Sequence, residues 1–150
     1  MAKKFKFKLD GLLKVREFKE KRIKVELGEI LKDIEQTKAN IDKAKLDIEE
    51  CYKAQEAFLN EPAGASMVQF FPQFIEAKTE DYKAQENILY SLQRKYEEKR
   101  RELAEAKGDV KVIENLKEKN KTAFEKSTEK KRQEAIDELM QAKRHREKLL

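Results

Sequence analysis

The sequence has 150 residues, of which 43% are charged and 39% hydrophobic, with four Gly, two Pro and a net charge of +5. The length suits one domain, and a composition this rich in charge and this poor in helix breakers is typical of long helices or a coiled coil. It argues against an enzyme, because a closed catalytic core needs elements with broad apolar faces.

An apolar repeat with alternating steps of four and three residues runs through the first half of the chain. Its positions are Ile23, Leu27, Ile30, Ile34, Thr37, Ile41, Ala44, Ile48, Cys51, Gln55 and Phe58. This spacing keeps a narrow seam on one side of an α-helix, and such a seam is shielded from water only by another helix. We expect a first helix over about residues 9–59, ended by Pro62 and Gly64.

A second repeat of the same kind follows the turn. Its positions are Phe71, Ile75, Lys78, Tyr82, Gln85, Leu89, Leu92, Tyr96, Lys99, Leu103, Ala106, Val110 and Ile113. Ser66 with Gln69 resembles a capping box, whereas Pro72 prefers a first-turn position, so we expect a ragged start. The second helix is expected over about residues 71–145.

Together the two repeats predict an all-α fold, in which two long helices form an antiparallel coiled-coil hairpin with a turn at about residues 60–70. The whole chain is expected to be one domain, a rod rather than a globule. The second helix is longer and overhangs the first from about Thr122. Either a partner protein covers this overhang or it is largely mobile, because an isolated helix with few apolar residues frays.

Polar residues interrupt both seams. Such residues lower stability but fix the register of two paired helices. Lys78 and Gln85 allow a second interpretation, in which the seam opens near the turn to meet another protein.

Charge is segregated along the chain. Residues 1–24 hold ten basic and three acidic side chains, and residues 121–150 hold nine and six, whereas residues 47–86 hold three and nine. In a hairpin both termini lie at one end, so one end is basic and the other acidic. Solvated helix faces explain most charge runs, but this segregation also suggests two partners, one at each end.

Catalytic, metal and cofactor sites are not expected. Cys51 lies on the seam and is interpreted as a small buried residue, while the one histidine, His145, lies far along the chain. No Gly-rich phosphate loop and no set of converging metal ligands is present. The basic clusters at 130–132 and 143–146 alternate with acids, which argues against nucleic acid. With no apolar stretch of membrane-spanning length, a soluble cytoplasmic protein is predicted.

Apolar side chains gather around the predicted turn. They are Phe58, Met67, Val68, Phe70, Phe71, Phe74, Ile75 and Tyr82. Two helices cannot enclose all of them, so we expect an exposed patch of the kind that marks a protein contact, with Phe74 and then Phe70 as the leading candidates. The alternative is that all of them pack locally around a tight turn.

Two segments of the sequence resemble segments of proteins of the FliJ family. Residues 5–17, Phe-Lys-Phe-Lys-Leu-Asp-Gly-Leu-Leu-Lys-Val-Arg-Glu, resemble its opening pattern F-x-F-x-L-x-x-L-L-x-x-R. Residues 130–139, Lys-Lys-Arg-Gln-Glu-Ala-Ile-Asp-Glu-Leu, are similar to its Lys-rich end. The length and the hairpin layout agree over essentially the whole chain.

The resemblance implies a non-enzymatic stalk protein of the flagellar type III export apparatus. Such a stalk is cytoplasmic and peripheral at the inner membrane. It binds the central hole of a hexameric export ATPase, promotes assembly and activity of that ring, and links it to the cytoplasmic part of the membrane export gate. Export chaperones are a further implied partner, and motility is the implied process.

The resemblance and the charge pattern together nominate contact residues. Those nominated for the ATPase ring are Phe5, Phe7, Leu9, Leu12, Leu13, Arg16, Phe124, Lys130, Lys131, Arg132, Ile136, Leu139 and Met140. Those nominated for the export gate are Phe70, Phe74 and Ile75. An injectisome stalk homologue and a general cytoplasmic coiled-coil adaptor remain alternatives.

Overall fold

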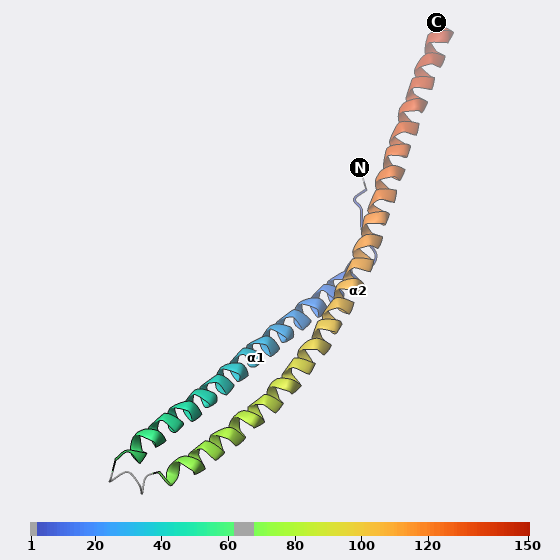
Figure 1. The fold of residues 1–150 in the computed structure, drawn as a ribbon. Helices are drawn as coiled ribbons and strands as arrows, with labels where there is room; N and C mark the ends of the chain where they lie inside the picture. Colours follow the sequence, from blue (N-terminus) through green and yellow to red (C-terminus); the bar gives the residue numbers. More distant parts are fainter. Residues whose placement is uncertain (1–2, 62–67) are drawn as a thin grey trace. The chain divides into compact units, whose positions relative to one another are not determined.

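The computed structural model describes residues 3–61 and 68–150, which form two α-helices and no β-strand. These are α1 (Asp10–Leu59) and α2 (Phe70–Leu149). The two helices pack against each other as a helical hairpin (Figure 1), so the predicted all-α hairpin is confirmed. Pro62 and Gly64, expected to end the first helix, Ser66 of the expected capping box, and Met67 of the apolar group around the turn lie outside the described residues.

Helix α2 begins one residue before the expected position and continues to Leu149. Pro72 therefore lies in the first turn, where its missing N–H removes no hydrogen bond within the helix. Arg146 and Lys148 lie in the last turn, where positive charge interacts favourably with the helix dipole. None of the described helices has a stretch both long and apolar enough to cross a lipid bilayer.

The contacts divide the chain into two compact units. Unit 1 comprises Met1–Glu20 and Glu105–Leu150, and unit 2 comprises Lys21–Ala104. Within each unit a segment of α1 runs antiparallel to a segment of α2. In unit 2, for example, Glu26 pairs with Lys99 and Lys45 with Glu86, so residue numbers rise on one helix as they fall on the other. Whether the chain is one domain stays a prediction.

The predicted seams are the faces that the helices bury. Every seam position named above is buried or half-buried, on both helices. On α1 of unit 2 the buried residues are Ile23, Ile34, Thr37, Ile41, Ala44 and Cys51. On α2 the buried residues are Ala106, Val110 and Ile113, all of which belong to unit 1. Seam positions of α2 in unit 2 are half-buried, because long and polar side chains occupy several of them.

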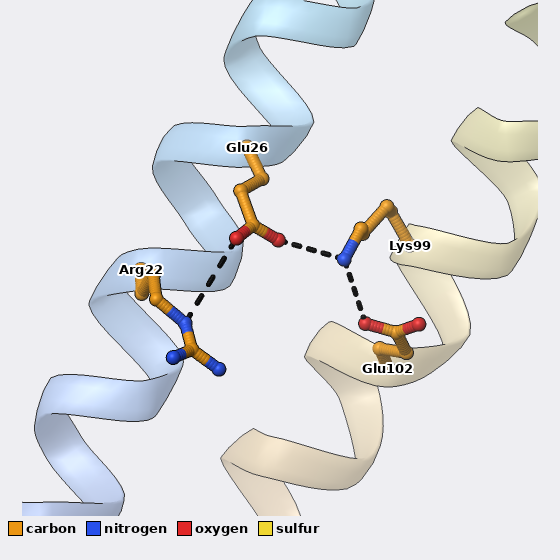
Figure 2. A network of polar contacts seen from close by, with 4 residues as sticks. All are labelled: Arg22, Glu26, Lys99 and Glu102. Carbon is orange, nitrogen blue, oxygen red and sulfur yellow. Dashed lines mark hydrogen bonds and ion pairs between the residues drawn. The ribbon is translucent and has the colours of Figure 1, made fainter.

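The polar seam residues make specific contacts. Figure 2 shows Lys99 of α2, whose Nζ lies 2.7 Å from Glu26 of α1 and 3.1 Å from Glu102 of its own helix. Lys78 Nζ lies 3.4 Å from Asp47 of α1. The Thr37 hydroxyl donates to the carbonyl oxygen of Asp33 at 2.8 Å. Because both lysines join the two helices, these contacts support the interpretation that polar seam residues fix register.

Candidate partner-binding surfaces

The segment before α1 in unit 1 alternates between packed and exposed side chains. Phe5 and Phe7 are half-buried, whereas Lys4 and Lys6 are exposed. The Phe7 side chain packs against a buried cluster of Leu13, Val110 and Ile113. The Phe5 ring lies 5.6 Å from the ring of Phe124, centroid to centroid. We name residues 3–8 the N-terminal arm; its phenylalanines hold it against α2 and its lysines remain in solvent.

Two polar contacts complete the pairing of the helices in unit 1. Arg16 Nη1 donates to the carbonyl oxygen of Asp109 at 3.0 Å, and Lys117 Nζ donates to the Asp10 carboxylate at 3.0 Å. The hydrogen bond and the positive charge of Lys117 lower the pKa of the Asp10 carboxyl below its ordinary value of 3.8. Both contacts link residues more than 90 positions apart in the sequence, so they define how this part of the hairpin closes.

Several residues nominated for the ATPase ring are therefore engaged inside unit 1. Leu13 is only 6% exposed, so a direct contact with a partner would require its side chain to leave the core. Phe124 was expected on an overhang without an intramolecular partner, and this expectation is wrong. Because the arm reaches past the start of α1, the Phe5 ring covers Phe124.

The rest of the nominated set is open to solvent. Leu9 and Leu12 are each 39% exposed, and every side chain from Glu125 to Leu150 is exposed. We name residues 125–149 the tail of α2. Ile136, Leu139 and Met140 stand three and four residues apart, which places them on one face of this helix. Lys130, Lys131 and Arg132 lie on the same tail and are exposed as well.

A shallow apolar depression lies in unit 2, at the start of α2. Its lining residues are Asp47, Glu50, Cys51, Ala54, Phe70, Phe71 and Phe74. Phe70 is 70% exposed and Phe74 45% exposed, while the Phe71 ring packs at a tilt against the Phe58 ring, with ring centroids 5.7 Å apart. Part of the aromatic group thus packs locally and part remains exposed, and the protein contact assigned to the exposed members stays a prediction.

Charges border this depression, which we name the aromatic groove. Lys78 Nζ lies 3.4 Å from Asp47 and 5.7 Å from the centroid of the Phe74 ring, which restrains the orientation of that ring. Asp47 and Glu50 supply negative charge at the edge. Ile75, the third residue nominated for the gate, is half-buried on the seam. Cys51 is buried beneath the groove, as its seam position predicted.

The exposed apolar residues of unit 1 that were missed from the sequence include Val15, Phe18, Val112 and Leu116. Val112 immediately precedes the seam position Ile113. Val15 and Leu116 hold the same place if the four-and-three spacing is continued to Arg16 and Lys117, and this place in the repeat is the signal that would have identified these three. Among residues 3–61 and 68–150, no group of three or more His, Cys, Asp or Glu side chains is arranged to hold a metal ion.

A comparison with models of known protein families gives a match over almost the whole chain. A family model described as "Flagellar FliJ protein" matches residues 5–149. The match includes the N-terminal arm from Phe5 onward, both helices and the tail. No curated protein and no solved structure matches the chain.

Proposed function

Because the chain belongs to the FliJ family, we propose that it is the non-enzymatic stalk protein of the flagellar type III export apparatus. It binds the central hole of a hexameric export ATPase and promotes assembly and activity of the ring. It also links the ring to the cytoplasmic part of the export gate. Its place is the cytoplasm, peripheral at the inner membrane, and export chaperones are further partners in a process that serves motility.

Two features of unit 1 support the ring contact: the N-terminal arm packs against α2, and the tail of α2 is exposed. Phe5, Phe7 and Leu13 fix where the two helices pair, and the tail then presents exposed side chains on every face. The exposed apolar residues Ile136, Leu139 and Met140 and the basic run at 130–132 offer a surface for another protein. Residues 1–20 of this unit hold seven basic and three acidic side chains, which give it a positive field.

The aromatic groove carries the gate contact. Exposed aromatic side chains in a depression are typical anchors in protein interfaces, and Phe74 and Phe70 have this character here. Nine acidic against three basic side chains over residues 47–86 favour a partner that is basic where it borders the groove. Ile75, the third nominated residue, directly follows Phe74 in α2 and is half-buried on the seam.

The mechanism is allosteric rather than catalytic. A single asymmetric chain within a six-fold ring contacts some subunits differently from others. Only a difference in contact between two states of a subunit can shift the equilibrium between those states. The chain therefore acts by stabilising one ring conformation at the subunits that it touches.

The experiment measures the binding of each partner to variants of the full chain. Charge reversal of Lys130, Lys131 and Arg132 is expected to weaken binding of the ATPase and to leave binding of the gate protein unchanged. Phe74→Ala is expected to do the reverse. Circular dichroism checks that both variants keep the helical content of the wild type. Loss of both partners by either variant would contradict the assignment of the partners to separate units.

A further inference from the structure

One face of the tail repeats the spacing of the seams, although its side chains are exposed rather than packed against α1. Its positions advance by four and three residues, so they lie on one side of α2. They are Arg132, Ile136, Leu139, Lys143 and Arg146, and Met140 borders them, four residues after Ile136. All six side chains are exposed. We name these six residues the tail face; it has an apolar centre and basic side chains toward both ends.

The acidic side chains of the same stretch lie elsewhere on the helix. Each residue advances by about 100° around an α-helix. Glu134, Asp137 and Glu138 therefore project more than about 100° away from the centre of the tail face. Glu129 and Glu147 share its side but lie beyond its two ends. The face itself is thus apolar and basic, with no acidic member.

The aromatic groove of unit 2 is apolar as well, but its border is acidic. Its exposed rings Phe70 and Phe74 come from α2, and Asp47 and Glu50 border it from α1. Lys78 offsets the charge of Asp47, from which its Nζ lies 3.4 Å away. Glu50 makes no salt bridge among the residues that the structure describes, so its charge is available to a basic side chain.

One pairing of these two surfaces between separate copies brings opposite charges together. Two tail faces would meet with basic side chains on both sides. Two grooves would meet within the segment 47–86, which holds nine acidic and three basic side chains. A tail face against a groove joins basic to acidic side chains and covers exposed apolar side chains on both copies. A second copy of this chain therefore has the surface that complements each of the two.

We propose that free chains associate head to tail, with the tail face of one copy seated in the aromatic groove of another. Such a contact joins two different surfaces, so each copy uses one tail and one groove, and the assembly extends as an open chain or closes into a ring. One consequence rests on the proposed function, which assigns the tail to the ATPase and the groove to the gate. Self-association and the binding of these partners then exclude each other.

Sedimentation velocity of the full-length wild type, with no partner present, measures the association. The average mass should rise with the concentration of the chain. It should fall as salt is raised, because salt screens the charges on both surfaces. A wild type that stays monomeric up to about 1 mM would overturn the inference.

Two variants each remove one of the surfaces. Leu139→Gln with Met140→Gln changes the tail face, and Phe70→Ala with Phe74→Ala changes the groove. Gln and Ala form helices well, so both chains should keep the helical content of the wild type. Each should associate at least about tenfold more weakly, because apolar side chains no longer become buried. Phe18→Ala, at a phenylalanine of unit 1 that is 69% exposed, is the matched control and should associate as the wild type does.

A mixture of the two double variants tests the head-to-tail arrangement. The tail variant keeps its groove and the groove variant keeps its tail, so together they should form a one-to-one complex that neither forms alone. This complex should stop at two chains, because no intact tail and no intact groove are left over. A mixture that stays monomeric under conditions in which the wild type associates would overturn the head-to-tail arrangement.

The outcomes separate this inference from the proposed function. The sedimentation experiment uses the chain alone, so a monomeric wild type leaves the stalk assignment standing. If the wild type associates but does not bind the export ATPase, the stalk assignment fails and the self-association stands. If it does both, added ATPase should dissolve the assembly. An assembly that persists with the ATPase bound would overturn the mutual exclusion.

Discussion

Units 1 and 2 use the same repeat in different ways. In unit 1 both helices contribute buried apolar residues, with Leu13 of α1 against Val110 and Ile113 of α2. In unit 2 the buried residues come from α1, and α2 contributes half-buried side chains such as Lys78 and Lys99 that pair with carboxylates. The comparison teaches that an apolar cluster stabilises the pairing in unit 1, whereas in unit 2 charged contacts supply much of the specificity of register.

The largest expected effect comes from truncating the cluster of unit 1. Ile113→Ala should lower the free energy of unfolding by about 2–4 kcal/mol, because it removes a buried side chain and leaves a void against Leu13. Leu92→Ala at a half-buried seam position of unit 2 should cost about half as much. Urea denaturation measures both, and equal losses would contradict the difference between the units.

Each unit also has one aromatic pair, which offers a matched comparison. Phe5→Ala removes the contact with Phe124, and Phe58→Ala removes the contact with Phe71, at similar centroid distances of 5.6 and 5.7 Å. Each change should lower stability by about 1–2 kcal/mol, since it loses both the aromatic contact and partial burial.

The two Phe variants should differ in where the loss appears. Hydrogen exchange should show faster opening of residues 3–20 and 105–124 in Phe5→Ala. Phe58→Ala should instead speed exchange in the last turns of α1. If Phe5→Ala left exchange in unit 1 unchanged, the N-terminal arm would not stabilise the pairing of α1 and α2 in that unit.

A stabilising change is available in each unit. Gly108 of unit 1 and Gly28 of unit 2 are helical, and a Cβ added at either would meet no atom within 4 Å. Each Gly→Ala change should raise the free energy of unfolding by about 1 kcal/mol, because alanine loses less backbone entropy on folding. Thermal melts compare the two variants with the wild type, and a fall in melting temperature would show that these glycines are required for packing.

The smallest expected effect is the pH dependence of two ion pairs. Lys117 lowers the pKa of Asp10 in unit 1, and Lys99 lowers the pKa of Glu26 in unit 2, in each case chiefly through a hydrogen bond. A carboxyl with a lowered pKa stabilises the fold above its ordinary pKa, and that contribution disappears as the pH falls through the lowered value. The pKa of Lys99 is raised, mainly by Glu26, so its contribution is lost only at alkaline pH.

Melts of Asp10→Asn and Glu26→Gln chains test this prediction. Each variant should be slightly less stable than the wild type near neutral pH, and the difference should shrink as the pH falls through the lowered pKa of each carboxyl. A difference that persists at acid pH would mean that these side chains stabilise the fold by some means other than charge.

The seam, and with it the hairpin, was predictable from the sequence because an apolar repeat determines which face of a helix is buried. Cys51 and Thr37 were located correctly on this basis, although neither is a typical core residue. The end of α2 was predicted less closely than the other helix ends, which lie within one residue of the expectation. The described residues place the end of α2 at Leu149, where no Pro or Gly marks a stop.

The nominated contact residues were harder to predict, because an apolar side chain in a motif can serve either packing or binding. The opening pattern was interpreted as a partner surface, yet Phe5, Phe7 and Leu13 pack inside unit 1. Their partners lie more than 90 positions away in the sequence, so no local pattern reveals them. Leu12 and Phe74, by contrast, stand off or beside the seam and remain exposed, which the repeat alone indicates.

The most direct test of the central claim is the rate of ATP hydrolysis by the purified export ATPase of the same organism, titrated with the full-length chain. The stalk assignment predicts that the rate rises and saturates when each hexamer holds one chain. A rate that stays at the value of the ATPase alone at every concentration of chain would contradict it.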